Sequence, residues 1–318
     1  MTIDLKLAHS PDADDLVMWW PLTGQRHPDG TPVDGGLGEP RVDLGPFRFT
    51  LLGGDVEALN AEAADRDDPP YDVTAISAGA YPALADRWRI TACGGSFGEG
   101  YGPRVVVRED SGIRSVDDLR GARVAVPGTR TSAFLTLSLL LGGADGGESD
   151  SGSGRGFEHE AMLFSDVPGA VAEGRADAGL LIHEAQLSHE TMGLRLVVDL
   201  GQWWGERTGL PLPLGLNVVR RDLDDRFGPG TIERLSRVLS ESVAHAATHR
   251  DDSYRHLIRN MGERTEWRDR AMVDRYLDMY VSGLTLDMGE GGREALRRLL
   301  GEGAMRGFIA DPGEIDVV

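Results

Sequence analysis

A chain of 318 residues, 40% of them hydrophobic and 27% charged, has the composition of a soluble globular protein with room for about two domains. Its net charge of −19 argues against nonspecific binding to nucleic acids, because that binding needs clustered cations to displace counterions. The single lysine, Lys6, lies in the first predicted strand, which argues against a lysine Schiff base, and the single cysteine, Cys93, excludes an intramolecular disulfide. The longest apolar run is too short to span a membrane, and the N-terminus is too short and polar for a secretory signal. We therefore expect a cytoplasmic protein, monomer or homodimer, that binds neither nucleic acid nor membrane.

The first predicted unit is a strand at Ile3–Ala8, a loop and a helix. Ser10 is expected to cap the helix, and acidic residues in the first turn favour the helix dipole. Capping alone accounts for this pattern. However, three acids are unusual at a helix start, which normally attracts anions. Asp12, Asp14 or Asp15 could therefore contact a polar ligand instead.

A second ligand-facing loop is predicted after the buried strand at 71–77. The strand leads into Ser77-Ala78-Gly79, and small residues there allow a ligand to approach the backbone and the next helix start. Before this strand, Gln25–Pro40 is rich in glycine and proline and is predicted to be a surface insertion. After it, a glycine-dense segment ends at Gly102-Pro103, the predicted first crossing between domains.

The third candidate loop follows a strand at Arg123–Val126. Thr129, Arg130 and Thr131 precede an apolar helix that extends to about Leu141. Hydroxyl groups and free amides at a helix start can form an anion pocket, to which an arginine adds charge. Simple capping by one of the threonines explains the pattern equally well. The following segment, 142–156, is of low complexity and is predicted to be a mobile loop.

A histidine directly follows the predicted strand at Ala178–Ile182. A side chain at the carboxyl end of a parallel strand is held at the edge of the cleft where open α/β sheets bind ligands. We therefore interpret His183, which precedes Glu184, as a general base. The alternative is that His183 only caps the next helix, and this stretch by itself favours neither.

The segment 199–215 is predicted to be a long return rich in aromatic residues and proline. Trp203 and Trp204 are expected on this loop, where they either line a ligand pocket by stacking or pack between domains. A strand resumes at Leu216–Arg220, which places the second domain crossing near Pro213–Asn217. From Gly228 onward, spaced apolar positions predict a helical region.

Several motifs resemble the menaquinone-biosynthesis branch of the type 2 periplasmic-binding-protein-like fold, from about residue 5 to residue 305. Within that branch they most resemble the 1,4-dihydroxy-6-naphthoate synthases of the futalosine route. The most specific motif contains the Ile-His-Glu step. The motifs are His9-Ser10-Pro11-Asp12-Ala13-Asp14-Asp15, Tyr71-Asp72-Val73-Thr74-Ala75-Ile76-Ser77, Gly100-Tyr101-Gly102-Pro103, Val126-Pro127-Gly128-Thr129, Asp177-Ala178-Gly179-Leu180-Leu181-Ile182-His183-Glu184 and Leu210-Pro211-Leu212-Pro213-Leu214-Gly215.

The resemblance implies an α/β fold of two lobes, each a mainly parallel sheet flanked by helices, with a helical C-terminal region. Lobe 1 would comprise residues 1–103 and 216–318, and lobe 2 residues 104–215. It implies a lyase that converts cyclic dehypoxanthinyl futalosine to 1,4-dihydroxy-6-naphthoate without a metal or organic cofactor, with His183 as general base. The resemblance also implies that the substrate is a small-molecule carboxylate. The residues expected to bind it are Ser10, Asp12, Asp14, Ser77, Ala78, Thr129, Arg130 and Thr131.

The first loop departs from the pattern of the better-known synthases. Residues 10–15 read Ser-Pro-Asp-Ala-Asp-Asp, where those enzymes carry Ser-Pro-Cys-Pro-Asn-Asp. Two alternatives therefore stay open at this point. One is chorismate dehydratase, which has the same fold, and the other is a non-catalytic protein that binds a small molecule.

Overall fold

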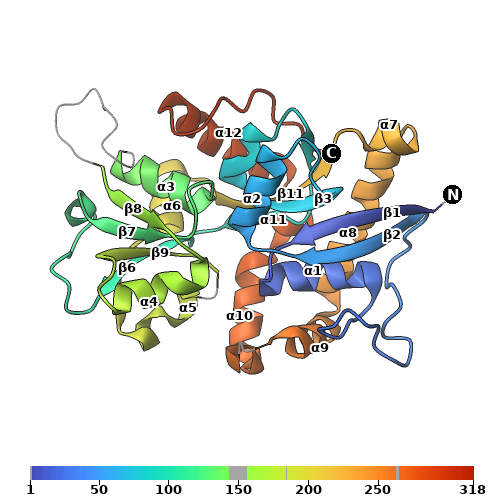
Figure 1. Ribbon diagram of the computed structural model, residues 1–318, viewed down its shortest axis with the longest axis horizontal. Helices are drawn as coiled ribbons and strands as arrows, with labels where there is room; N and C mark the ends of the chain where they lie inside the picture. The colour runs from blue at the N-terminus through green and yellow to red at the C-terminus, as the bar shows by residue number, and fades with distance from the viewer. Residues whose placement is uncertain (1, 143–155, 184, 263–264) are drawn as a thin grey trace.

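Two separate sheets organise this α/β chain in the computed structural model, which describes residues 2–142, 156–183, 185–262 and 265–318 (Figure 1). Within these residues, the first sheet has six strands in the order β2-β1-β3-β11-β4, with β5 also paired to β11. The second has five strands in the order β10-β6-β9-β7-β8. The strands of the first sheet are β1 (Ile3–His9), β2 (Phe47–Gly53), β3 (Val73–Ser77), β4 (Trp88–Ile90), β5 (Ser96–Gly98) and β11 (Leu212–Arg220). Those of the second are β6 (Arg104–Arg108), β7 (Arg123–Val126), β8 (Glu158–Ala161), β9 (Ala178–Leu181) and β10 (Leu194–Asp199).

Both sheets are mixed, which corrects the expectation of mainly parallel sheets. β1 runs parallel to β2 and β3, and β7 runs parallel to β8 and β9. In contrast, β11 is antiparallel to β3, β4 and β5, and β6 is antiparallel to β9 and β10. Two neighbouring parallel strands need a long crossover connection, usually a helix, within one sheet. β6 and β11 are each the first strand after the chain has crossed from the other sheet, so they have no such connection.

Helices surround both sheets. The α-helices are α1 (Ala13–Thr23), α2 (Val56–Asp65), α3 (Ser132–Leu141), α4 (Val167–Ala172), α5 (Ala185–Ser188), α6 (Leu200–Thr208), α7 (Leu223–Phe227), α8 (Thr231–Thr248), α9 (Arg250–Asn260), α10 (Arg270–Tyr280), α11 (Gly283–Leu286) and α12 (Gly289–Met305). The 3-10 helices are η1 (Ala78–Ala83), η2 (Asp117–Leu119), η3 (Phe164–Asp166), η4 (His189–Met192) and η5 (Thr265–Arg268). No helix in the described ranges is long and apolar enough to cross a membrane.

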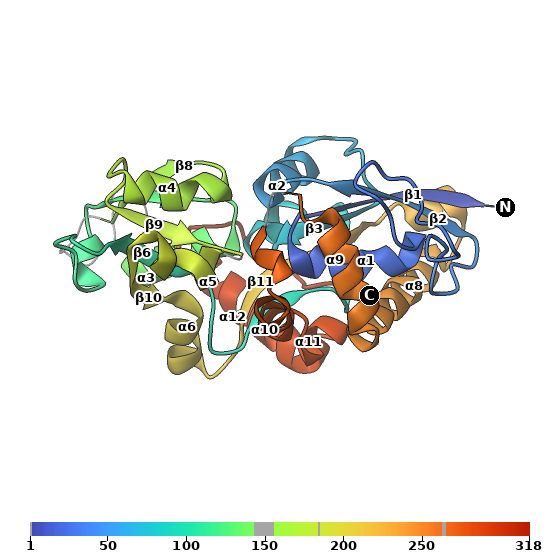
Figure 2. The same ribbon diagram turned by 90° about the horizontal axis from the view of Figure 1, so that it is seen from below.

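The chain has two halves, which lie side by side in Figures 1 and 2. We call the first sheet with α1, α2 and α7–α12 the first half, and the second sheet with α3–α6 the second half. The chain passes from the first half to the second between β5 and β6, as Gly102-Pro103 predicts. It returns at β11, which begins at Leu212, four residues before the predicted strand. The division into two domains at these crossings stays a prediction.

Three of the C-terminal helices, α8, α9 and α10, cover α1 in the first half. α1 packs against α8, α9 and α10 (Figure 2). Met18, Trp19 and Trp20 of α1 are 0–1% exposed, so this helix is enclosed between the sheet and the C-terminal helices. The helical pattern predicted after Gly228 is confirmed, and its apolar positions are what bury α1. The helix that carries the first acidic loop is therefore held rigidly.

α3 joins the two halves. Four of its leucines, which point in different directions, are buried, as expected of a helix that is apolar nearly all round: Leu135, Leu137, Leu139 and Leu141. α3 packs against η1, β11 and α12 of the first half and against α6 of the second half. One apolar core consequently runs through both halves, including Ile76 and Trp88 on one side and Val105 and Val124 on the other. The structure therefore holds the two halves together around α3.

The insertion at 25–40 lies against α9. The side chain of Gln25 donates to the backbone carbonyl oxygen of Asp252 (3.3 Å). The side chain of Asn260 donates to the backbone carbonyl oxygen of Arg26 (3.1 Å). The insertion is thus anchored at its beginning, while much of residues 28–36 is exposed. The second predicted loop, 142–156, lies outside the described residues except at its two ends, Gly142 and Gly156.

The tryptophan pair lies on a helix, so the prediction of a loop at 199–215 was wrong for its first part. The Asp199 side chain caps α6 by accepting hydrogen bonds from the amides of Gly201 (3.0 Å) and Gln202 (3.1 Å). These caps stabilise a helix whose tryptophans and glycines are poor helix formers. Trp204 is fully buried in the shared core and Trp203 is half-buried, and neither lines the cleft described below.

Replacing Trp204 with alanine should therefore destabilise the protein far more than the same change at Trp203. Removing a fully buried tryptophan typically costs about 3–5 kcal/mol. Replacing the half-buried Trp203 with alanine should lower the free energy of unfolding by less than half as much. Urea unfolding of both variants, followed by circular dichroism, measures the difference. Equal losses would contradict the packing described here.

Candidate functional site

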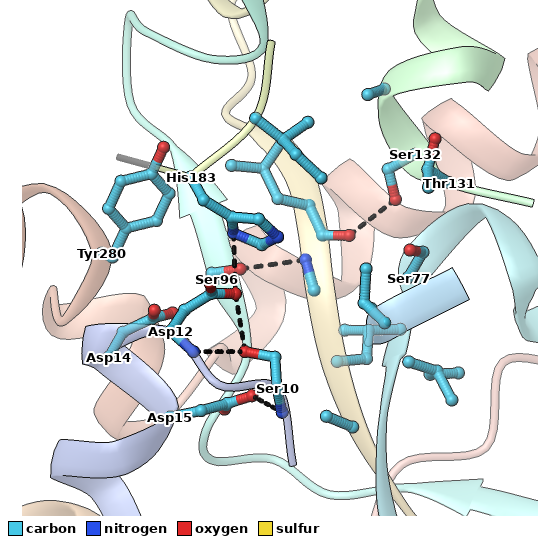
Figure 3. A pocket seen from close by; sticks show the side chains of 18 of the residues that line it. Ser10, Asp12, Asp14, Asp15, Ser77, Ser96, Thr131, Ser132, His183 and Tyr280 are labelled. Carbon is cyan, nitrogen blue, oxygen red and sulfur yellow. Dashed lines mark hydrogen bonds and ion pairs between the residues drawn. The ribbon is translucent and has the colours of Figure 1, made fainter. Parts of the chain in front are cut away.

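A cleft lies between the two halves where several strands of both sheets end (Figure 3). The loop after β1, the end of β3 and the segment after β9 contribute to it, together with the beginning of α3. The polar residues that line it are Ser10, Asp12, Asp14, Asp15, Ser77, Ser96, Thr131, Ser132, His183, Gln186, Asn217 and Tyr280. The apolar lining includes Val56, Ile76, Pro103, Ile182 and Leu214.

His183 projects into this cleft from the turn after β9, which ends at Leu181. Its backbone has φ +54°, the only positive φ among the described residues other than glycine. A non-glycine residue is held in this region only when its surroundings impose it, and such residues cluster at functional sites. The imidazole Nδ1 lies 2.8 Å from Asp12 Oδ2, and Phe164 contacts the ring edge-on at 4.9 Å between centroids. The His183 ring is turned toward Asp12 of the first half, so this contact, and not a cap on the next helix, accounts for its orientation. Glu184 lies outside the described residues.

The first acidic loop is organised differently from the expected cap. α1 begins at Ala13 with Asp12 at the N-cap position, so the prediction of Ser10 as cap was wrong. Ser10 donates instead to two carboxylates: its amide to Asp15 Oδ2 (2.7 Å) and its hydroxyl to Asp12 Oδ2 (2.7 Å). Acceptors within five residues draw both donors away from the helix end. The loop therefore presents Asp12 to the cleft in a fixed orientation.

Asp14 and Asp15 are both buried at the start of α1. Burial raises the pKa of Asp14 well above its ordinary value, and the neighbouring carboxylates of Asp15 and Asp12 raise it further. Burial also raises the pKa of Asp15, against which His9 and the Ser10 hydrogen bonds act. The Tyr276 hydroxyl donates to Asp14 Oδ1 (3.1 Å). Of these two carboxyls, Asp14 has the stronger tendency to hold a proton.

The opposite wall supplies hydroxyl groups, some of which are already engaged. Thr131 caps α3, accepting from the Phe134 amide and donating to the Gly128 carbonyl oxygen. Ser132 donates to the Leu214 carbonyl oxygen (2.6 Å) and accepts from the Gly79 amide (3.0 Å). The contacts of Thr131 therefore agree with the interpretation that this residue caps the helix.

Two other hydroxyls keep a proton to donate. Ser77 Oγ accepts a hydrogen bond from Asn60 Nδ2 (3.1 Å), and Ser96 Oγ accepts one from the Gly215 amide (2.9 Å). Both side chains line the cleft. An oxygen that accepts from the protein can direct its own proton toward a ligand. Ser77 and Ser96 are the hydroxyl donors best placed for this purpose.

The predicted site residues divide into two groups. Ser10, Asp12, Asp14, Ser77, Thr131 and His183 come together in the cleft. Ala78, Thr129 and Arg130 do not line it. Arg130 turns toward the first half, where its guanidinium pairs with Asp65 (2.8 Å) and its amide donates to Glu57 Oε1 (3.1 Å). No lysine or arginine is among the described residues that line the cleft.

Sequence reasoning missed Ser96, Ser132, Gln186, Asn217 and Tyr280 as lining residues. Ser132 directly follows Thr131, so the helix-start argument could have included it. Tyr280 ends α10, almost 100 residues after His183, and no local pattern indicates that it reaches the cleft. Within the described residues, no group of three or more His, Cys, Asp and Glu side chains is arranged to hold a metal ion.

Residues 5–304 match the model of a family described as menaquinone biosynthesis. The chain belongs to this family. The 1,4-dihydroxy-6-naphthoate synthase of Thermus thermophilus is 34% identical to it over 306 residues, 96% of both chains. The synthase of Streptomyces coelicolor is 32% identical over 305 residues, 96% of this chain and 94% of the relative.

Solved structures confirm the fold prediction. A protein of Archaeoglobus fulgidus superposes with a TM-score of 0.75 at 36% identity, covering 96% of this chain and 98% of that one. A Candida albicans protein with the generic periplasmic binding protein fold gives a TM-score of 0.67 at 8% identity, covering 99% and 96%. The alkanesulfonate-binding protein of Xanthomonas axonopodis gives 0.63 at 17% identity, covering 97% and 95%. The last two show the fold alone.

Asp14→Asn should stabilise the protein at alkaline pH. Because burial raises the pKa of Asp14, the unfolded chain loses this proton first as the pH rises above about 4, so stability falls until the folded state also ionises. Asparagine removes this titration and keeps an acceptor for Tyr276. We expect the melting temperature to rise by at least about 2 °C at pH 8, the shift that about 1 kcal/mol produces in a large domain. The gain should shrink toward pH 4.

Asp29→Asn is the matched control for this titration. Asp29 is exposed, and hydrogen bonds from Thr31 lower its pKa, so its loss should give no gain at pH 8. A gain for Asp14→Asn that does not depend on pH would contradict the account.

Proposed function

We propose that the protein is a 1,4-dihydroxy-6-naphthoate synthase, a carbon–carbon lyase of menaquinone biosynthesis that acts in the cytoplasm. Its substrate would be cyclic dehypoxanthinyl futalosine. Family membership over residues 5–304 and two relatives of that name, each matching nearly the whole chain, support this assignment. The structural observation that carries it is His183, held in a cleft between two halves with Nδ1 2.8 Å from a buried carboxylate.

His183 is assigned as the general base. The reaction breaks a carbon–carbon bond and releases the sugar-derived part of the substrate while a ring aromatises. It therefore needs a base for a weakly acidic proton and donors for the oxyanion that forms. A neutral imidazole is suited to the first task near neutral pH. Since Asp12 engages Nδ1, Nε2 is the nitrogen that takes the proton.

Neutral donors are assigned to the oxyanion and to the substrate carboxylate. The hydroxyls of Ser77 and Ser96 have protons to donate, and the beginning of α3 brings helix amides to the same wall. Because the described lining contains no cation, these dipoles would replace a salt bridge. On the facing wall, burial raises the pKa of Asp14 and so favours its neutral form, which lowers the negative charge that the substrate meets.

Contact between the halves would keep water from the reaction. Ser132 of the second half bonds to Leu214 and Gly79 of the first, and α3 packs against α12. Substrate would enter when these contacts open, and closure would then exclude water and complete the site. We infer that the arrangement described here corresponds to the closed form.

The purified protein should convert cyclic dehypoxanthinyl futalosine to 1,4-dihydroxy-6-naphthoate and leave chorismate unchanged. His183→Ala should lower turnover by about 10²–10⁴-fold, the usual cost of removing a general base, while substrate still binds. Product analysis by liquid chromatography and mass spectrometry measures both substrates. His249→Ala, an exposed histidine at the end of α8, is the matched control and should retain activity.

Other outcomes would replace this assignment. Consumption of chorismate alone would indicate the dehydratase that shares this fold. Binding of cyclic dehypoxanthinyl futalosine without turnover would indicate a non-catalytic binding protein. Normal turnover by the His183→Ala variant would remove the general-base role.

A further inference from the structure

We propose that Asp12 is the positioning residue of His183, and that the two form an aspartate–histidine dyad across the cleft. The proposal rests on the function assigned above and goes beyond it, because sequence reasoning expects Asp12 to bind substrate. In the dyad, Asp12 accepts the Nδ1 proton of the imidazole. That interaction fixes the tautomer in which Nε2 carries the lone pair that removes the substrate proton.

Asp12 is buried, and its carboxylate contacts both His183 and Ser10. The residue is 1% exposed, and its Oδ2 lies 2.8 Å from His183 Nδ1 and 2.7 Å from the Ser10 hydroxyl. Its own amide donates back to Ser10 Oγ (3.2 Å), which ties the side chain to the loop. Figure 3 shows this chain of contacts from Asp15 through Ser10 and Asp12 to the imidazole. A carboxylate held in this way orients the histidine and would repel an anionic substrate.

The second half holds the histidine in place from its other sides. The His183 backbone adopts φ +54°, and Phe164 contacts the ring edge-on. With its amide oxygen turned toward α10, Gln186 accepts hydrogen bonds from the Tyr280 hydroxyl (2.8 Å) and from the backbone N–H of His183 (3.2 Å). Backbone and ring are therefore both constrained, so the contact with Asp12 decides the tautomer.

Asp12 differs from the neighbouring titratable groups in its contact with the imidazole. The titratable groups that face His183 from other elements, within the described residues, are Asp12, Asp14 and Tyr280. Asp15 lies behind Ser10 and accepts its amide hydrogen bond. Tyr276 donates to Asp14, whose pKa is raised by burial, so Asp14 tends to be neutral. Asp12 is consequently the carboxylate that balances the imidazolium after proton transfer.

The dyad also links catalysis to the contact between the halves. Asp12 follows β1 of the first half, whereas His183 follows β9 of the second. The pair exists only when the two halves are together. The base therefore has its correct tautomer and its counter-charge whenever the halves are in contact, with or without substrate, and closure over a substrate keeps both in place.

The first test is the pH dependence of kcat and kcat/KM for cyclic dehypoxanthinyl futalosine in Asp12→Asn and Asp12→Ala. We expect kcat to fall about 10²–10⁴-fold with little change in KM, the behaviour of a residue that orients a catalytic histidine. The acid limb of the profile should move to lower pH, because losing a nearby negative charge makes the imidazole easier to deprotonate. Asp72→Asn is the control and should leave the profile in place, because this buried carboxylate lies at the opposite end of β3 from Ser77 and accepts the Lys6 amide. A raised KM with unchanged kcat and profile would show that Asp12 binds substrate instead.

The second test needs no turnover, and its readout comes from the wild-type protein. Two-dimensional NMR of the wild-type protein with 15N-labelled histidine reports the tautomer of the neutral His183 ring, assigned by its absence in His183→Ala. The dyad predicts a proton on Nδ1 at alkaline pH. A proton on Nε2 would overturn the proposal. Because no substrate is present, this result stands even if the protein does not convert cyclic dehypoxanthinyl futalosine, so the two failures are distinguishable.

Discussion

Three aspartates buried at the beginning of one helix set the constraint on which the rest of the site depends. The partial positive charge at the start of α1 favours carboxylates there, but three of them cannot all ionise without water or partners. The structure gives each a different solution. Asp15 accepts a hydrogen bond from the Ser10 amide, Asp12 pairs with His183, and Asp14 lies against the Tyr276 hydroxyl with a raised pKa. One wall of the cleft thus holds a carboxylate paired with an imidazole beside a carboxyl whose pKa is raised by burial.

This constraint explains why the two halves belong together. The partner of Asp12 comes from the second half, so separating the halves would leave the carboxylate without its imidazole. α3 reinforces the contact because its buried leucines face both halves, and Ser132 bonds to Leu214 at its start. Apolar packing supplies affinity between the halves, while the polar contacts determine how they align. Opening for substrate entry must therefore break a small number of directional contacts along one side of α3.

Much of this architecture could be predicted from the sequence, because buried strands and helix starts leave local patterns. The strand before His183 and the loop after β1 are examples. The resemblance of their motifs to a known family then indicated that the two segments line the same cleft. Local preference failed where a nearby group competed. Ser10 is a good helix cap, yet Asp12 and Asp15 take its donors, and α1 begins at Ala13. Arg130 suits an anion pocket, yet Asp65 and Glu57 of the facing half draw it away. Tyr280 reaches the cleft and Tyr276 reaches the Asp14 carboxyl only through the packing of α10, which no local signal reports.

The most direct test of the account is a crystal structure of the His183→Ala variant with cyclic dehypoxanthinyl futalosine bound. The account predicts that the substrate lies between the Ser77–Ser96 wall and the Asp12 loop. Its reacting carbon should face the space that the imidazole vacates, within the roughly 3–3.5 Å over which reacting atoms must approach once the ring is restored. A substrate bound outside this cleft, or one whose reacting carbon faces away from residue 183, would contradict it.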